Sequence, residues 1–300
     1  LKNVPVLFKS PKRLRFEFIK KYSSSFSISA MCRVLKVTRT GYYCHIGHKR
    51  SNREITNEII LEEIINIFDK SKKTYGSPRI SILLNRKGIF CSKNRIARMM
   101  QRHKICALRP SRKRKSYQTD TPSLISDNLV KRNFNADSPN KIWLTDITYI
   151  KTSEGFVYLV SFIDVFSRKI KGWSLGKHMT AQFVSNAFKN AAAKENIKEG
   201  LIIHSDRGCQ FSSHLFLEEL KKVKATPSMN APGTPYDNAM MESFFNTLKN
   251  ELKQQFPFKN FMEAERKIFQ YIEIFYNRER IHSSLNYITP QEYEDNYYKK

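Results

Sequence analysis

Three acidic residues in the second half of the chain stand where a carboxylate could take part in chemistry. Four apolar or β-friendly residues, Leu201 to His204, predict a buried strand that runs into Asp206. An ionised carboxylate at the end of a buried strand is costly unless a positive charge lies beside it. Its partner is therefore either the neighbouring Arg207 or a metal ion.

Asp146 interrupts a second predicted strand, in the run WLTDITY, where bulky or apolar side chains flank it on both sides. If this strand and the strand before Asp206 are neighbours in one sheet, the two carboxylates converge near the same edge. Carboxylates that lie so close raise each other's pKa unless a cation lies between them.

Glu242 is the third candidate, on a long helix that we expect to begin at about Ala239. At 100° per residue the helix has an apolar stripe made of Met241, Phe245, Leu248 and Leu252. A separate polar stripe consists of Glu242, Asn246, Lys249 and Lys253. Such a stripe could place a carboxylate on a metal and amines on DNA phosphates. An ordinary exposed helix face is the alternative interpretation.

Two Asp and one Glu offer hard oxygen ligands, which favour Mg²⁺ or Mn²⁺ over zinc. Two such ions about 3.5–4 Å apart can support phosphoryl transfer. A serine nucleophile at Ser205 is not favoured, because adjacent strand residues such as Ser205 and His204 point to opposite faces. The sequence also lacks the glycine patterns of a P-loop or a dinucleotide-binding turn.

The strands and helices predicted around these acids form a mixed sheet with helices packed against it. We expect strands at 141–152, 156–167, 169–176, 201–206 and 226–230, and helices at 180–196, at 212–225 and from 239 onward. A Gly- and Pro-containing loop, residues 231–238, leads into the last helix. This order predicts the α/β class.

The first part of the chain carries most of the positive charge. Of the formal net charge of +26, residues 1–120 hold +22 and residues 121–300 hold +4. This imbalance predicts a module that binds a polyanion, with nucleic acid favoured over a membrane. No apolar run is long enough for a membrane helix. Five scattered cysteines without a C-x-x-C pair favour reduced thiols in a cytosol.

Helical patterns occupy this basic part. A short helical pattern covers 26–48, and a clearer helix begins at Ser51 with a capping box. A second helix is predicted with Ser77 as cap, Pro78 at its first position and Gly88 as its stop, and a third with Ser92 as cap. The third helix leaves four basic side chains outward, and a polar, basic linker follows it. The predicted DNA contacts on this helix and in the linker are Lys93, Arg95, Arg98, Arg102, Arg112, Lys113, Arg114 and Lys115. Two short helices joined by a glycine turn predict a helix-turn-helix, although small three-helix bundles have a similar pattern.

Asp146, Asp206 and Glu242, with 35 residues between the last two, resemble the DDE triad of the retroviral-integrase-like transposases. The runs HSDRGCQF, PYDNAMMESFFNTLKNE and YNRERIHSSLNYITPQEY are similar to the transposase encoded by the second reading frame of IS-three family bacterial insertion sequences. TYGSPRISILLNRKGIFCSKNRIARMMQRHKI resembles the helix-turn-helix of that family, and MCRVLKVTRTGYY the segment before it. The resemblance covers about residues 28 to 294. In GYYCH, His45 stands where the family usually has an aromatic residue.

The resemblance implies a ribonuclease-H-like integrase catalytic core, a mixed five-stranded sheet with flanking helices, preceded by all-α helix-turn-helix DNA-binding modules. The implied domains are a basic helical segment at 1–50, a helix-turn-helix-like domain at 51–108, a basic linker at 109–138, the catalytic domain at 139–255 and a helical tail at 256–300. The implied activity is nicking and strand transfer at terminal inverted repeats, with two Mg²⁺ (or Mn²⁺) held by Asp146, Asp206 and Glu242.

The resemblance further implies that Lys249 and Lys253 contact DNA, and that Arg207 contacts DNA or orients its loop. It implies a homo-oligomer on DNA, a location at the nucleoid in the bacterial cytoplasm, and an upstream-frame helix-turn-helix protein to which the chain is fused or with which it cooperates. Two alternatives stay open: a metal-dependent endonuclease of the same fold without strand transfer, and a catalytically silent DNA-binding repressor.

Overall fold

The structure is a computed structural model that describes residues 10–47, 52–108, 126–131, 133–195, 197, 199–231 and 238–299. The chain divides into two compact units, residues 1–63 and 64–300. Within the described residues no helix is long and apolar enough to cross a membrane.

The second unit is built on a five-stranded mixed sheet, as the sequence predicts. Its strands, in chain order, are β1 (Ile142–Thr152), β2 (Gly155–Asp164), β3 (Ile170–Gly176), β4 (Ile202–Ser205) and β5 (Thr226–Met229). Their order across the sheet is β3-β2-β1-β4-β5. The first three strands are antiparallel, whereas β4 runs parallel to both β1 and β5. β1 therefore lies at the centre, beside the strand that ends at Asp206.

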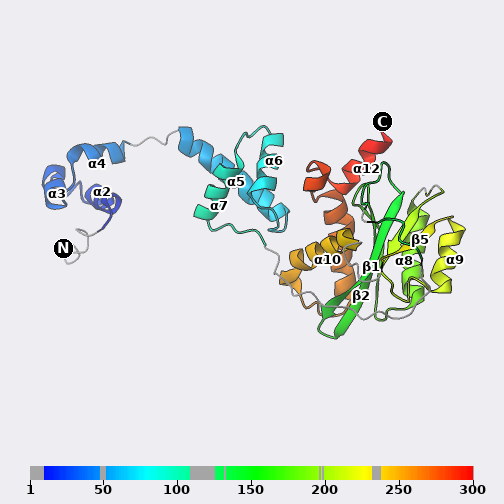
Figure 1. The fold of residues 1–300 in the computed structure, drawn as a ribbon. Helices are drawn as coiled ribbons and strands as arrows, with labels where there is room; N and C mark the ends of the chain where they lie inside the picture. Colours follow the sequence, from blue (N-terminus) through cyan, green and yellow to red (C-terminus); the bar gives the residue numbers. More distant parts are fainter. Residues whose placement is uncertain are drawn as a thin grey trace. The chain divides into compact units, whose positions relative to one another are not determined.

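Helices cover both faces of this sheet, because successive residues of a strand point to opposite sides. Trp143 belongs to the core beneath α8 (Ala181–Lys194) and α9 (His214–Lys222). Its neighbour Leu144 belongs to the core beneath α10 (Ala239–Glu251) and α11 (Phe261–Phe269). Figure 1 shows α10 on one side of β1 and β2 and α8 on the other. The α/β class and the mixed sheet with flanking helices are confirmed.

The last helix, α12 (Pro290–Tyr298), is attached to the sheet by a buried ionic cluster. The Lys171 Nζ lies 2.6 Å from an oxygen of Glu294 and 2.7 Å from an oxygen of Glu195. The Lys169 Nζ adds a contact of 2.9 Å to Glu294. Burial alone would lower the pKa of Lys171, but Glu294 and Glu195 outweigh it and raise that pKa. The C-terminal helix is therefore part of the same folded body as β3.

Six helices precede the sheet in the described part of the chain. They are α2 (Lys12–Lys21), α3 (Ile28–Val34), α4 (Arg39–Ile46), α5 (Asn52–Lys70), α6 (Ser77–Arg86) and α7 (Lys93–Arg102). The sequence interpretation missed α2, whose first residue follows Pro11 without a side-chain cap. The predicted cap of α7 is confirmed, since the Ser92 hydroxyl accepts a hydrogen bond from the Arg95 N–H at 3.3 Å.

Two other predicted helix starts have different outcomes. The prediction that Ser77 caps α6 is wrong: Gly76 is the extended residue before the helix, and Ser77 is already its first helical residue. Pro78 does lie in the first turn, where its missing N–H leaves no helical hydrogen bond unmade. Gly88 follows the end of α6 with φ of +79°, as a helix stop requires. The predicted cap Ser51 lies outside the described residues.

Candidate active site

The two aspartates are brought together by the parallel pairing of β1 and β4. In the register of this pair Leu144 lies opposite His204. Asp146 and Asp206 each follow two residues later, so both lie beyond the paired residues at the same end. Because side chains alternate along a strand, Asp146 shares the face of Leu144, which is the face that α10 covers.

The electrostatics of Asp146 show that the three acids interact. Its carboxylate is half-buried and accepts one hydrogen bond of 2.7 Å from the Ile147 N–H. Burial, together with the charges of Asp206 and Glu242, raises the pKa of Asp146 to about 8. Lys249 opposes this rise only in part. The fold thus disfavours the ionised form of Asp146 at a point of the sheet where two further acids lie nearby.

Glu242 reaches this region from the first turn of α10, where its side chain is exposed. The helix is held by the apolar stripe predicted from the sequence, since Met241, Phe245 and Leu248 are all buried. Its start is tied to β1 by Asn238, which donates a hydrogen bond of 3.0 Å to the Thr145 carbonyl.

Lys249 lies two turns further along α10 and faces β1. Its amine donates to the Thr148 hydroxyl at 2.5 Å and lies 4.3 Å from the centre of the Tyr149 ring. The sequence interpretation named neither strand residue. A signal was available, because Thr148 follows Asp146 by two residues and so shares its face.

The other predicted lysine of this stripe, Lys253, does not continue the α-helix. α10 ends at Glu251, and Lys253 begins a short 3₁₀ helix, Lys253–Gln255. The helical spacing that aligned Lys253 with Glu242 therefore does not apply, because a 3₁₀ helix turns by a larger angle per residue.

Arg207 binds a backbone carbonyl on the neighbouring strand end. The Arg207 Nε donates a hydrogen bond of 2.9 Å to the Asn230 carbonyl, which follows β5. Asp206 accepts a hydrogen bond of 3.0 Å from the Gly208 N–H, yet burial still raises its pKa. Arg207 thus connects the loop after β4 to the end of β5, and no ion pair with Asp206 is formed within the described part of the chain.

The donor set fits a divalent cation by its chemistry. Among the residues that the structure describes, no group of three or more His, Cys, Asp or Glu side chains is placed so that it could already hold a metal ion. The three acids nonetheless supply only oxygen donors, and a hard cation would relieve the repulsion that Asp206 and Glu242 exert on the ionised form of Asp146. Since Glu242 is exposed on the helix surface, its side chain has room to change rotamer.

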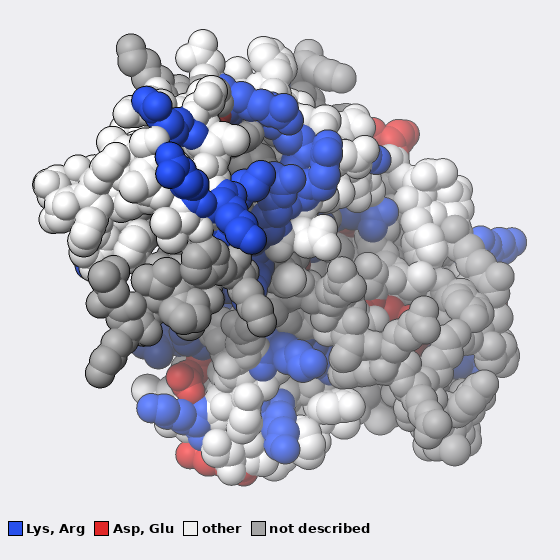
Figure 2. Space-filling view, turned by 90° about the vertical axis from the view of Figure 1, so that its left-hand side faces the viewer, with Lys and Arg blue, Asp and Glu red and all other residues white. Residues whose placement is uncertain are grey.

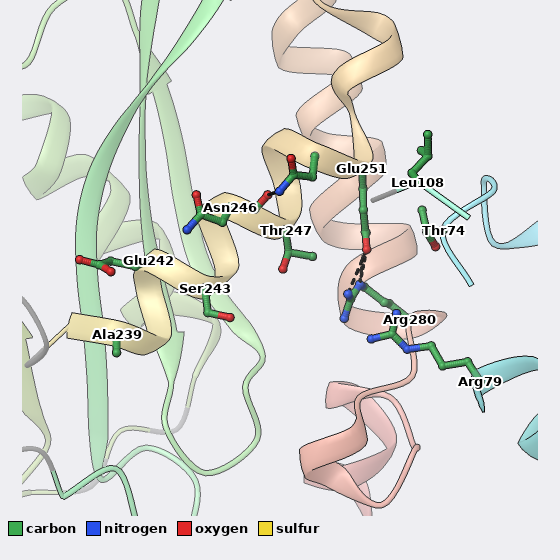
Figure 3. A pocket seen from close by; sticks show the side chains of 11 residues that line it. Thr74, Arg79, Leu108, Ala239, Glu242, Ser243, Asn246, Thr247, Glu251 and Arg280 are labelled. Atoms are coloured by element: carbon green, nitrogen blue, oxygen red, sulfur yellow. Dashed lines mark hydrogen bonds and ion pairs between the residues drawn. The ribbon is translucent and has the colours of Figure 1, made fainter. Parts of the chain in front are cut away.

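A pocket of about 500 Å³ extends from Glu242 along α10. Figure 3 shows Glu242, Ser243, Asn246 and Thr247 along the helix, with Arg79 and Arg280 on the opposite side. A buried ion pair forms part of this wall, with the Arg280 Nη2 and a Glu251 oxygen 2.9 Å apart. Hydroxyl, amide and guanidinium groups thus dominate the approach to Glu242 from this side.

The predicted DNA contacts of α7 lie on its outer face. Lys93, Arg98 and Arg102 are exposed and Arg95 is half-buried, whereas Ile96, Met99 and Met100 are buried as predicted. The other four predicted contacts, Arg112, Lys113, Arg114 and Lys115, lie outside the described residues. On the face drawn in Figure 2, Lys and Arg side chains outnumber Asp and Glu.

Three protein-family models match the chain. Two are described as an integrase core domain and match residues 136–235 and 223–290. The third is described as an HTH-like domain and matches residues 54–114. The integrase matches include all three acids, and the HTH-like match includes α6 and α7.

Two curated relatives are similar over most of their length. The transposase for insertion sequence element IS904 of Lactococcus lactis is 42% identical over 248 residues, which are 82% of this chain and 98% of the relative. Transposase InsF for insertion sequence IS3A of Escherichia coli K12 is 36% identical over 287 residues, which are 94% of this chain and 99% of the relative. Among solved structures, the HTLV-2 integrase catalytic core domain in complex with magnesium matches 53% of this chain and 99% of its own, with 22% identity and a TM-score of 0.43.

Proposed function

The chain belongs to the IS-three family of insertion-sequence transposases, and from this premise we propose that it binds the terminal inverted repeats of its element and catalyses metal-dependent strand nicking and strand transfer. The observation that supports this chemistry most directly is the parallel pairing of β1 and β4, which brings Asp146 and Asp206 to the same end of the sheet, near Glu242 on the first turn of α10. A carboxyl whose ionised form is disfavoured by burial and by two neighbouring acids is suited to hold a cation.

Asp146, Asp206 and Glu242 would hold two Mg²⁺ ions, with Mn²⁺ as a substitute. A metal centre at these residues would supply the activation of a water or a 3′-hydroxyl and the stabilisation of the leaving oxygen. The protein holds Asp146 with the Ile147 N–H and Asp206 with the Gly208 N–H, so that both carboxylates are oriented by backbone donors. Glu242 would move from its exposed position to complete the set.

Lys249 would bind a DNA phosphate beside this centre. Thr148 and Tyr149 already hold its amine next to the strand that carries Asp146. An amine is a compact point charge and suits a phosphate oxygen. Arg207 acts on the loop after β4, and Lys253 would contact DNA from beyond the end of α10.

Duplex binding away from the reacting phosphate would rest on the basic part of the chain. The outer face of α7 would supply Lys93, Arg95, Arg98 and Arg102, and the 109–138 linker would supply Arg112, Lys113, Arg114 and Lys115. This follows the proposed division into 1–50, 51–108, 109–138, 139–255 and 256–300. We further propose a homo-oligomer on DNA at the bacterial nucleoid and cooperation with an upstream-frame helix-turn-helix protein.

A labelled duplex that carries the terminal repeat tests the proposal in the presence of Mg²⁺. Joined products are expected; cut products alone would indicate the endonuclease, and a shifted band without either would indicate the repressor. Asp146→Asn, Asp206→Asn and Glu242→Gln should each reduce nicking and joining by several orders of magnitude while repeat binding survives. Glu218→Gln, which changes an exposed acid on α9, is the matched control. Cleavage at a near-normal rate by folded Glu242→Gln would refute the proposed site.

A further inference from the structure

The first unit contains a three-helix bundle outside the HTH-like match at 54–114. α2, α3 and α4 enclose a small core in which Ile19, Leu35 and Tyr42 are at most 2% exposed. Gly41 lets α4 approach its neighbours, since a Cβ at this position would lie 3.2 Å from the Phe16 ring of α2. The bundle thus has its own packed interior.

The connection from α3 to α4 has the geometry of a tight helix-to-helix turn. It consists of the four residues 35–38, among which Lys36 has φ of +51°. Turns of three to four residues, often with a glycine for the positive φ, join the two helices of a helix-turn-helix. Arg15 holds the turn from α2, because its Nη1 donates to the Leu35 carbonyl at 3.2 Å. The Thr38 hydroxyl caps α4 by accepting from the Gly41 N–H at 3.1 Å.

α4 exposes side chains that can read base edges. Arg39, Thr40 and Tyr43 are exposed, while Tyr42 between them is buried. An Arg fork can pair with guanine in the major groove, and a hydroxyl can pair with several bases. The major groove of B-DNA is about 12 Å wide and admits an α-helix.

The charge of the bundle favours DNA over a protein partner. Residues 10–47 contain eight Lys and Arg and one Glu, a formal net charge of +7. The centre of a protein interface is depleted of charged residues, whereas a DNA-binding surface is strongly positive. Four basic residues of α2, Lys12, Arg13, Lys20 and Lys21, are exposed and can contact phosphates.

We propose that α3 and α4 form a second helix-turn-helix, in which α4 enters the major groove and reads bases through Arg39, Thr40 and Tyr43. The inference rests on the proposed function, because the duplex it would read is the terminal repeat of the element. It assigns to residues 28–46 a sequence-reading role separate from that of α6 and α7.

The test measures binding of the full-length chain to two duplexes of about 30 base pairs at one salt concentration. One duplex carries the terminal repeat from the DNA that flanks the coding sequence, and the other a scrambled sequence of equal composition. Arg39→Ala should weaken repeat binding about 5- to 100-fold, the cost of one lost base contact, and change scrambled binding at most a few-fold. Tyr43→Ala should act in the same direction. Lys20→Ala, which removes a charge from α2, should weaken binding to both duplexes by the same factor.

A base-by-base substitution of the repeat locates the contact. Some base substitutions that weaken binding of the wild-type chain should no longer weaken binding of Arg39→Ala. The base pairs at which this happens should be adjacent in the repeat. Equal weakening of both duplexes by Arg39→Ala and Tyr43→Ala, in proteins with an unchanged thermal midpoint, would overturn the inference. So would a wild-type chain without preference for the repeat. Joining of precut repeat ends by the same preparations tests the proposed function separately, because that reaction requires the acids of the other unit.

Discussion

Replacing Asp146 by Asn should stabilise the metal-free protein while it abolishes catalysis. The folded state raises the pKa of Asp146 from 3.8 to about 8. At pH 7 the carboxyl therefore keeps its proton when folded and is ionised when unfolded. Each pH unit between 3.8 and 7 lowers the free energy of unfolding of the wild-type protein by about 1.36 kcal/mol. The full loss at pH 7 is therefore about 4 kcal/mol. Because Asp146 is half-buried, solvent screens part of this loss. We therefore expect Asp146→Asn to raise the free energy of unfolding by roughly 1–3 kcal/mol.

The sign of the pH dependence follows from the raised pKa. The unfolded chain loses this proton at lower pH than the folded protein does, so the wild-type protein loses stability as the pH rises from about 4 to about 8. The gain from Asp146→Asn should therefore be near zero at pH 4 and largest near pH 8. The Asn Oδ1 can still accept the Ile147 N–H, so no hydrogen bond is lost to offset the gain.

Thermal unfolding in EDTA measures this effect. For a unit of this size about 1 kcal/mol corresponds to roughly 2–4 °C, so the midpoint should rise by roughly 2–12 °C. Asp137→Asn, at an exposed position before the same strand, should change stability by no more than about 0.5 kcal/mol. Added Mg²⁺ should stabilise the wild-type protein and not the variant. A lower midpoint in EDTA, or a gain independent of pH, would refute the charge-repulsion account of the site.

Three further predictions concern DNA contact and stability. Lys249→Ala should slow strand transfer at moderate salt and leave Mg²⁺-induced stabilisation intact; an unchanged rate would mark Lys249 as a surface residue. Arg280→Met should destabilise the protein by about 3–5 kcal/mol in denaturant titration, because it leaves the Glu251 carboxylate buried and unpaired. The double change with Glu251→Met should recover most of that loss, and no recovery would exclude the ion pair as its cause. DNA binding should weaken steeply with salt, and Arg102→Ala should lower the slope of log K against log salt by about 0.9, whereas an unchanged slope would place Arg102 away from phosphates.

The local sequence pattern was enough to predict the strands and the helix that carry the three acids. The alternation in WLTDITY and the apolar run before Asp206 predict β1 and β4, because a half-buried strand and a fully buried strand each need those patterns. The stripe of Met241, Phe245 and Leu248 likewise predicts the buried face of α10. Pattern was weaker at helix ends: it misplaced the cap of α6 and carried α10 past Glu251 to Lys253. Helix ends depend on the backbone angles of one or two residues, which no periodicity encodes.

The contacts between distant segments were decided only by the tertiary structure. Nothing near Lys171 in the sequence indicates Glu294, 123 residues later, as its buried partner. The same holds for Lys249 and Thr148, and for the choice of Asn230 as the acceptor of Arg207. The sequence alone determined which carboxylates could bind a metal ion and on which strands and helix they would lie. The raised pKa of Asp146 required the fold, because burial and the approach of Asp206 and Glu242 arise only when β1, β4 and α10 pack together.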